Sequence, residues 1–391
     1  MPTGERKGDH GCASTFRDAE NRKATKVMKK ILKISGSVLL AIIVLLVLVI
    51  FAGRIITKAQ YKIEGENSIY ESTYVDINGL EQYVLIKGEN INNPVILWLH
   101  GGPGSPDSFE DYQFVKYLAD DYTVVCYDQR GCGATYFKNT DIDPNNETTS
   151  FEQAIEDVDA LVDYLCDRFD QEKIIVVGHS YGTILGTNYV AGHQDKVSCY
   201  VGVGTAVGGV QGYILGYEDA MKIATANGED TSKLEEAYNK YLDDPSLENL
   251  LNVRITAAPY HVGKKEKGNF AIVKDTIISP DFHFPHLRWY LKQLNYDSFY
   301  NLNKNLMDVV MDVNCDLIRE AGSDFTIPIG LINGDADWYT PASMVEEYYQ
   351  EINAPKKGLK IMEECGHMVA QFDDPGGFAE VLKEMLASFE Q

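Results

Sequence analysis

The sequence predicts an α/β fold in which a mainly parallel sheet is flanked by helices, with an inserted, mostly helical cap domain and an N-terminal transmembrane helix. Three observations lead to this prediction. Apolar and β-branched runs alternate with amphipathic segments between about residues 82 and 203, which is the rhythm of βαβ units and parallel sheets. This rhythm breaks from about 208 to 323 and then returns. A stretch of 20 residues without charge, 34–53, precedes the folded part.

The charge-free stretch, 34–53, has the length of a transmembrane helix. Its central part, 38–52, is apolar throughout. At about 1.5 Å per residue, 20 helical residues span roughly 30 Å, the thickness of a bilayer core. The alternative is a cleaved signal peptide. The apolar run is at the long limit for such a peptide, and Thr57 and Ala59 are the only weak candidates for a cleavage site. We therefore favour a retained anchor.

Charges on either side of the anchor predict its orientation. Residues 1–33 contain nine Lys or Arg and four acidic residues, a net charge of +5, whereas the other flank carries only Arg54, Lys58 and Lys62 nearby. Because the more positive flank stays in the cytoplasm, we expect a single-pass protein of the cell membrane. Its N-terminus is cytoplasmic and the bulk of the chain is extracellular.

The rest of the chain is acidic, since the whole chain has a net charge of −23. Such a surface repels nucleic acid, so no nucleic-acid partner is expected. Six of the seven cysteines follow the anchor, and their scattered spacing indicates neither a compact disulfide framework nor a metal site. Pairing of these six in an oxidising compartment stays open. They are Cys126, Cys132, Cys166, Cys199, Cys315 and Cys365.

The secondary-structure pattern divides the chain into five parts. A helix is predicted over 151–169, where apolar residues recur at helical spacing, and a final helix over 377–389. Predicted strands cover 82–87, 94–99, 122–127, 173–177, 197–203, 327–332 and 359–362. The predicted parts are a cytoplasmic basic segment (1–33), the transmembrane helix (34–53), a stalk (54–71), the α/β core (72–207 and 324–391) and the cap (208–323). An insertion of this kind usually covers the carboxyl ends of the strands, where ligands bind.

The segment Gly178-His179-Ser180-Tyr181-Gly182 has the pattern Gly-x-Ser-x-Gly. It lies between a predicted strand and a segment that tolerates small residues, which is the context of a nucleophile elbow. A serine at such a sharp turn projects its hydroxyl from the corner, and flanking glycines leave room for the neighbouring strand and helix. The alternative is a chance match of common loop residues.

A glycine-rich loop, His100-Gly101-Gly102-Pro103-Gly104, ends another predicted strand. Backbone N–H groups in such a loop approach a developing oxyanion without obstruction from side chains. We expect the oxyanion hole to use the N–H groups of Tyr181 and Gly102. A tight turn without chemistry is the alternative.

Two further positions complete the chain order Ser, Asp, His. Asp335 and Asp337 both follow a late predicted strand, and we favour Asp337 as the acid that orients an imidazole. His367 follows the last predicted strand. It would take a proton from Ser180 and return it to the leaving group.

These motifs give the chain its resemblance to the α/β-hydrolase superfamily, and within it to proline iminopeptidases and related serine hydrolases. The resemblance covers about residues 75–391. The motifs are the glycine loop, the elbow, Asp128-Gln129-Arg130-Gly131-Cys132-Gly133, Gly334 with Asp337 and Pro341, and Gly366-His367. The resemblance implies that Ser180 is the nucleophile, Asp337 the acid and His367 the base. It also implies removal of an N-terminal residue from short peptides without a metal or organic cofactor.

The chain departs from that family at several positions. Tyr181 stands where the family often has Trp, and Ala134 and Thr135 stand where it often has Ser. The family binds the substrate's free amine with acidic residues of the cap, one of them beside a tryptophan. The single cap tryptophan here, Trp289, has no acidic neighbour, and the nearest aromatic–acidic pair contains Glu218. Glu218 is therefore the candidate for substrate binding, with a solvated helix face as its alternative.

The sequence thus predicts a membrane-anchored serine hydrolase, an aminopeptidase of the proline iminopeptidase type that acts through an acyl-enzyme. One alternative is an esterase or amidase that acts on small non-peptide substrates. Another is a surface binding protein that has lost catalysis, against which Ser180, Asp337 and His367 argue. Haloalkane and epoxide chemistry on this fold needs an acidic nucleophile, which Ser180 disfavours.

Overall fold

The computed structural model describes residues 12–312 and 315–390. The chain divides into two compact units, Met1–Thr57 and Lys58–Gln391, and we call the second the globular unit. The first part of the predicted basic segment, residues 1–11, lies outside the described residues. The six cysteines after the apolar stretch are all free, so no disulfide constrains the globular unit.

Helix α1 covers Cys12–Gln60. Within it, Met28–Gln60 is long and apolar enough to cross a membrane. Leu45 and Phe51 in this part are 62% and 63% exposed. Apolar side chains exposed in this way are stable only where something apolar covers them. The helix extends to both sides of the predicted 34–53, so the first residues of the predicted stalk are helical.

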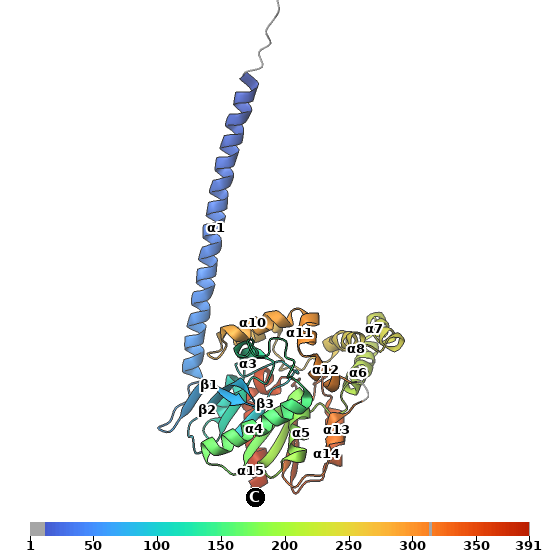
Figure 1. The fold of residues 1–391 in the computed structure, drawn as a ribbon. Coiled ribbons are helices and arrows are strands. Elements are labelled where there is room, and N and C mark those ends of the chain that lie inside the picture. The colour runs from blue at the N-terminus through green and yellow to red at the C-terminus, as the bar shows by residue number, and fades with distance from the viewer. Residues whose placement is uncertain (1–11, 313–314, 391) are drawn as a thin grey trace, which may run out of the picture. The chain divides into compact units, whose positions relative to one another are not determined.

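An eight-stranded sheet forms the centre of the globular unit, in the order β1-β2-β4-β3-β5-β6-β7-β8 (Figure 1). Strands β3 to β8 run parallel to one another, whereas β2 pairs antiparallel with β4 and β1 pairs antiparallel with β2 at the edge. The strands are β1 (Ile69–Ile77), β2 (Leu80–Gly88), β3 (Val95–Leu99), β4 (Thr123–Tyr127), β5 (Ile174–His179), β6 (Val197–Val203), β7 (Ile329–Gly334) and β8 (Lys357–Met362). The predicted mainly parallel sheet is confirmed.

Strand β1 was missing from the predicted elements. It pairs with β2 through a two-residue turn, Asn78 and Gly79, whose φ angles are +49° and +81°. Positive φ at both positions is typical of the tight hairpin turns that match strand twist. β1 is an edge strand with many exposed residues, and its composition therefore resembles a polar linker. The predicted stalk, 54–71, overlaps α1 at its start and β1 at its end.

Helices pack on both faces of the sheet, as predicted. α4 (Phe151–Phe169), α5 (Tyr181–Gly192) and α14 (Ala342–Glu351) contribute to the core on one face. α2 (Tyr112–Leu118) and α15 (Pro375–Glu390) contribute to the core on the other face. The bounds of α4 agree with the prediction because its start is marked by a capping residue, Ser150, whose Oγ accepts a hydrogen bond from the Gln153 N–H.

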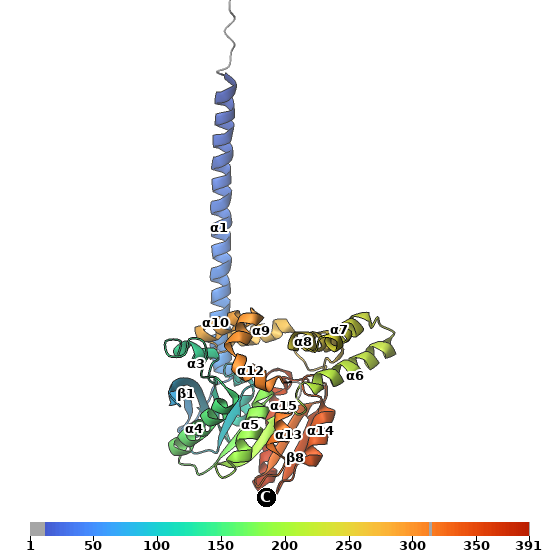
Figure 2. The same ribbon diagram turned by 45° about the vertical axis from the view of Figure 1, so that its right-hand side comes forward.

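A helical insertion lies between β6 and β7, in the part of the chain where the sequence analysis expects a cap (208–323). In both views α10 lies at one end of the insertion, whereas α6, α7 and α8 lie at the other end (Figures 1 and 2). The described helices are α6 (Gln211–Asn227), α7 (Ser232–Asp243), α8 (Leu247–Ala257), α9 (Asn269–Ile278), α10 (Phe284–Gln293), α11 (Tyr296–Leu302), α12 (Lys304–Val310) and α13 (Leu317–Ala321), with a 3₁₀ turn at Ala258–Tyr260.

Helix α10 is attached to the core by two buried hydrogen bonds. The indole N–H of Trp289 donates to the Gly104 carbonyl at 2.8 Å. His286 Nε2 lies 3.1 Å from Asp128 Oδ2, and both side chains are fully buried. Gly104 lies in the glycine loop after β3 and Asp128 lies in the loop after β4, so the insertion is fixed to both loops.

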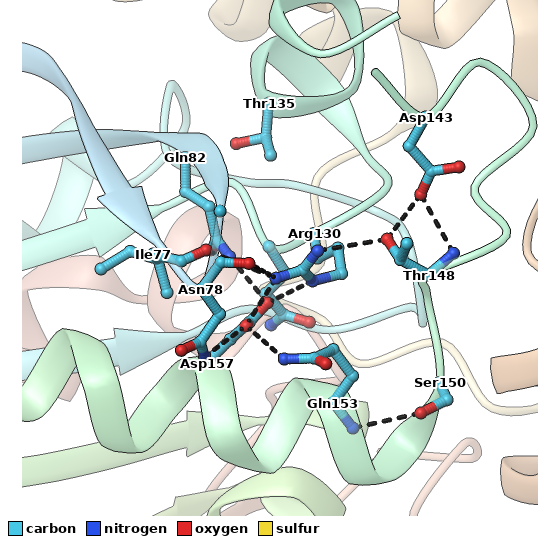
Figure 3. A network of polar contacts seen from close by, with 12 residues as sticks. Ile77, Asn78, Gln82, Arg130, Thr135, Asp143, Thr148, Ser150, Gln153 and Asp157 are labelled. Atoms are coloured by element: carbon cyan, nitrogen blue, oxygen red, sulfur yellow. Dashed lines mark hydrogen bonds and ion pairs between the residues drawn. The ribbon is translucent and has the colours of Figure 1, made fainter.

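The loop after β4 is held by a buried ion pair, which Figure 3 shows with its surroundings. Arg130 Nε and Nη2 donate to the two oxygens of Asp157, in α4, at 2.6 and 2.8 Å. Arg130 also donates to the Ile77 and Asn78 carbonyls of the β1–β2 hairpin. Removing one partner of a buried pair typically costs about 3–5 kcal/mol. The pair thus joins the loop, the hairpin and α4 into one rigid corner.

Candidate active site

Ser180 occupies a strained corner between β5 and α5. Its backbone has φ +55° and ψ −122°, a conformation that residues with a side chain rarely adopt. Glycine is required on both sides of the corner. A Cβ at position 178 would lie 2.3 Å from the Gly182 carbonyl oxygen, and one at position 182 would lie 2.0 Å from the Leu99 carbonyl oxygen. This is the geometry of a nucleophile elbow.

His367 and Asp337 are brought together from separate loops. His367 Nδ1 lies 2.8 Å from Asp337 Oδ2. Because a carboxylate only accepts, Nδ1 carries the proton, and this leaves Nε2 as a free base. The loop that contains His367 follows β8, and the loop that contains Asp337 follows β7. Neighbouring parallel strands therefore place the two side chains at the same edge of the sheet.

Asp337 is fully buried among donors that favour its ionised form. Burial alone would raise the pKa of this carboxyl, but the charge and hydrogen bond of His367 and the donors of Thr340 outweigh burial, and the pKa lies below its usual value. Thr340 Oγ1 donates to Oδ2 at 2.6 Å, and the Tyr339 and Thr340 N–H groups both donate to Oδ1 at 2.9 Å. The carboxylate is thus fixed in position and charge.

Two rings hold His367 in place. His179 Nε2 donates to the His367 carbonyl at 3.0 Å. Burial lowers the pKa of His179 to about 3, so this ring stays neutral and keeps the donor. The Tyr339 ring stacks on the His367 ring with centroids 4.6 Å apart. His179 is the residue that precedes the serine, so the elbow itself supports the loop of the base.

The glycine loop after β3 passes directly over Ser180. A Cβ at position 101 would lie 2.9 Å from the Ser180 Cβ. Gly102 has φ +119°, and a Cβ there would lie 2.6 Å from the Ser105 nitrogen. Tyr181 is the first residue of α5, where backbone N–H groups lack intrahelical partners and carry positive partial charge. Gly102 and Tyr181 both line the cavity that Ser180 lines, and their role in an oxyanion hole stays a prediction.

The loops after β3 and β4 are joined through His100. Its Nε2 accepts a hydrogen bond from the Gln129 N–H at 3.1 Å, and its carbonyl accepts one from Gln129 Nε2 at 3.0 Å. Its Nδ1 faces the Gly101 carbonyl at 2.9 Å. Burial lowers the pKa of His100 to about 4, so the ring remains neutral and can accept at Nε2. Rigid attachment of this loop fixes the N–H groups near Ser180.

A cavity of about 420 Å³ lies above these residues, between the core and the helical insertion. Ser180, His367, Gly101, Gly102 and Tyr181 all line it. Aromatic and apolar side chains form most of its wall, including those of Phe109, Tyr213, Trp289, Val310 and Met311. Its volume is within the usual range for small-molecule sites. Among the described residues, the wall contains few charged groups: Asp107, Glu110 and Arg254.

Comparison with known proteins agrees with this geometry. Residues 94–375 match the family described as alpha/beta hydrolase fold. The chain belongs to the α/β hydrolase fold family. The chain is 23% identical over 327 residues to the probable aminopeptidase YbaC of Bacillus subtilis, a match that covers 82% of this chain and 97% of that protein.

Other relatives carry related names. The proline iminopeptidase of Lactobacillus helveticus is 31% identical over 120 residues, which cover 30% of this chain and 37% of that protein. The solved proline iminopeptidase of Mycobacterium smegmatis aligns with a TM-score of 0.57 at 17% identity, over 82% of this chain and 98% of that one. A solved membrane phospholipase A aligns with a TM-score of 0.53 at 17% identity, over 91% and 98% of the two chains. These two structures share the α/β hydrolase fold.

The sequence-predicted substrate residue of this α/β hydrolase, Glu218, lies elsewhere. It is exposed on α6 and is not among the residues that line the cavity. Asp335, the alternative acid, is exposed as well. Within the described residues, the acidic side chains that line the cavity are Asp107 and Glu110. Both follow the glycine loop rather than belonging to the cap. The assignment of Glu218 was based on a neighbouring aromatic residue, which says nothing about the direction of the side chain.

Glu110 is a buried carboxyl that faces the cavity. Its Oε1 accepts hydrogen bonds from Thr276 of α9 at 2.7 Å and from Tyr290 of α10 at 3.1 Å. Burial raises the pKa of Glu110 to about 7 despite these donors. Burial also raises the pKa of Asp107 to about 8, against the donors Trp98 and Gln371. Burial therefore raises the pKa of both carboxyl groups in the cavity wall.

Sequence reasoning also missed the supporting residues of the α/β hydrolase site. His179 and Thr340 contact the base and the acid, and Arg254 of α8 lines the cavity. Thr340 lies three residues after Asp337, a spacing at which a side chain readily meets a carboxylate in a tight loop. Arg254 carried no signal in the sequence, because its position depends on how the insertion folds over the core.

Substitution of Gly182 tests the packing of the elbow. We expect Gly182→Ala to lower the free energy of unfolding by about 1–3 kcal/mol, because its Cβ would overlap the Leu99 carbonyl, and to abolish activity. Thermal unfolding of the full chain in detergent measures the first effect. The control is Gly192→Ala on the same helix, where a Cβ meets no atom within 4 Å. Equal stability of the two variants would contradict the prediction.

Proposed function

We propose that this α/β hydrolase is a membrane-anchored serine aminopeptidase of the proline iminopeptidase type, which releases N-terminal residues from short peptides. The observation that carries the proposal is the His367–Asp337 pair at 2.8 Å, in the cavity that Ser180 also lines. The names of the relatives, aminopeptidase and proline iminopeptidase, support the choice of peptide substrates.

The proposed reaction proceeds through an acyl-enzyme. Ser180 Oγ attacks the carbonyl carbon of the first peptide bond while His367 Nε2 takes its proton. The N–H groups of Gly102 and Tyr181 stabilise the oxyanion. His367 then gives the proton to the leaving amine, and the C–N bond breaks. Water, deprotonated by the same Nε2, hydrolyses the ester and regenerates the Ser180 hydroxyl. Asp337 stabilises the imidazolium in both steps.

Glu110 is the group that we propose to receive the free amine of the substrate. It is buried at the cavity wall, and only its Oε1 has hydrogen-bond partners among the described residues. Its Oε2 is therefore available for an ammonium group. An ion pair shielded from water in this way is stronger than an exposed one. The Glu110 position follows the loop that contacts Ser180, so the amine would lie next to the scissile carbonyl.

An esterase that acts on small acyl substrates is the second candidate. The observation that favours it is the largely aromatic and apolar wall of the cavity, which accommodates an acyl chain without a charged group. The two functions differ in whether the substrate amine contributes to recognition.

A substrate panel decides between them. We expect wild-type protein to cleave aminoacyl p-nitroanilides with a higher kcat/KM than p-nitrophenyl acyl esters of similar size, since an ammonium group adds a contact with Glu110. Ser180→Ala should lower kcat by a factor on the order of 10⁶ and prevent labelling by a fluorophosphonate. Faster cleavage of acyl esters would exclude the aminopeptidase. Labelling that persists in Ser180→Ala would exclude this serine as the nucleophile.

The pH dependence of Glu110→Gln tests the amine site. Glu110 attracts an ammonium group only when ionised, so preference for aminoacyl over acyl substrates should rise as pH increases through about 7. It should fall again when the substrate amine loses its proton, at about pH 7.7–8.0. Glu110→Gln should lower kcat/KM for the aminoacyl substrate by about 10- to 100-fold and flatten this profile.

The matched control is Glu218→Gln, which removes an exposed carboxyl of the insertion. We expect it to behave as wild type. If Glu218→Gln, and not Glu110→Gln, removed the preference for aminoacyl substrates, then the amine site would be the one predicted from the sequence.

We also propose that the N-terminus is cytoplasmic and the globular unit extracellular. The proposal is supported by the membrane-spanning length of Met28–Gln60 and the net charge of +5 over residues 1–33. Protease added to intact cells should then remove the globular unit and leave a cytoplasmic marker protein intact. Digestion of the globular unit only after the cells are opened would reverse the orientation.

A further inference from the structure

Arg254 is a cationic residue of the cavity wall that has no role in the reaction proposed above. It belongs to α8 and lines the cavity together with Ser180 and His367. No carboxylate among the described residues forms an ion pair with it. Its Nη1 donates to the Tyr213 hydroxyl at 3.4 Å, a long hydrogen bond. Its Nε is buried and has no hydrogen-bond partner in the described part of the chain.

Aromatic rings hold the guanidinium in place. Its Cζ lies 4.6 Å from the centre of the Tyr339 ring, 5.3 Å from that of Tyr213 and 5.8 Å from that of Trp338. Cation–π contacts at these distances fix the orientation of an arginine. The Tyr339 ring also stacks on the His367 ring, at 4.6 Å between centroids. The Tyr339 ring therefore contacts both the guanidinium of Arg254 and the imidazole of His367.

An arginine in this environment favours the binding of an anion. Its charge is partly removed from water, which is costly when no opposite charge compensates for it. Its planar group presents donors that match the two oxygens of a carboxylate. The described residues supply no such carboxylate, so a carboxylate of the substrate is the group that fits this position.

The order of the strands places Arg254 and Glu110 on opposite sides of Ser180. Glu110 follows β3, Ser180 follows β5, and Tyr339, on which Arg254 packs, follows β7. In the sheet these strands occur in the order β3-β5-β6-β7. At about 4.8 Å per strand, β3 and β7 lie roughly 14 Å apart. The two views agree, because α10, which contacts Glu110, and α8 lie at different ends of the insertion (Figures 1 and 2).

We infer that Arg254 binds the C-terminal carboxylate of the substrate, so that the preferred substrates are dipeptides and tripeptides with both termini free. This inference rests on the proposed aminopeptidase function. Glu110 holds the ammonium of the first residue, Ser180 attacks the bond that follows it, and Arg254 holds the carboxylate of the leaving part. At about 3.3–3.6 Å per residue, two or three residues extend roughly 7–11 Å. Two inward-pointing side chains close the rest of the distance between β3 and β7.

The test compares a peptide with and without its C-terminal charge. Prolylalanine, prolylalanine amide and proline p-nitroanilide are offered to the full chain in detergent. We expect wild-type kcat/KM for prolylalanine to exceed that for its amide by about 10- to 100-fold, as charge-assisted hydrogen bonds do. Arg254→Gln should lower the ratio of kcat/KM for prolylalanine to that for its amide to about one, mainly by raising KM for prolylalanine. Arg254→Lys should retain part of the preference.

A matched control is Lys240→Gln, which removes one positive charge from an exposed position of the neighbouring helix α7. It should behave as wild type. Equal cleavage of prolylalanine and its amide by wild-type protein would overturn the inference and leave the aminopeptidase function in place. A parallel loss of all three activities in Arg254→Gln would overturn it in favour of a structural role. Absence of any p-nitroanilide cleavage in the wild type would overturn the proposed function itself.

Discussion

The contact between the Leu99 carbonyl and Gly182 is the constraint on which the rest of the site depends. A Cβ at position 182 would lie 2.0 Å from that oxygen, so the end of β3 and the start of α5 touch through backbone alone. This contact allows the glycine loop to pass over Ser180. It also forces the serine into a corner with φ +55°, at a cost of order 1–3 kcal/mol. The surrounding sheet compensates for this strain, because Ser180 N donates to the Val203 carbonyl at 2.9 Å.

A loop that contacts a nucleophile must itself be immobile, and buried polar groups provide this. His100 joins the glycine loop to the next loop through Gln129. That loop is in turn anchored to α4 by the bidentate pair of Arg130 and Asp157 (Figure 3). Asp128, in the same loop, forms a hydrogen bond with His286 of the insertion. Hydrogen bonds of Arg130 and Asp128, two residues of one loop, therefore connect this loop to the β1–β2 hairpin and to α10.

Sequence reasoning identified the parts of the site that lie on regular elements or at their ends. The bounds of α4, the corner at Ser180 and the strand ends before Asp337 and His367 follow from local patterns, because strands, caps and glycine turns have local physical causes. Glu110 could not be found in this way. Its burial and its facing the cavity depend on contacts with Thr276 and Tyr290, which are more than 160 residues away in sequence.

Neither the edge strand β1 nor the role of Arg254 was predicted from the sequence, because local composition does not show which neighbours a segment contacts in the fold. β1 pairs with β2 and buries only the end of one alternating face, Val75 and Ile77, so its polar, exposed residues resemble those of a linker. Arg254 lies on a helix whose inner face is defined only when the insertion closes over Tyr339. A surface helix and a cavity-lining helix have similar compositions. The sequence of such a helix therefore does not show whether a charged side chain faces the solvent or the cavity.

The net charge of −23 therefore says little about substrate choice, which depends on the few charges inside the cavity. Burial raises the pKa of Glu110 to about 7, so this carboxyl is largely neutral below that pH. An arriving ammonium group would lower the pKa and favour the ionised form, since opposite charges stabilise each other most where water is excluded. A neutral acyl substrate offers no such compensation. Below about pH 7, Glu110 therefore stays neutral beside an ester and ionises beside the ammonium group of a peptide, and selectivity follows from this difference.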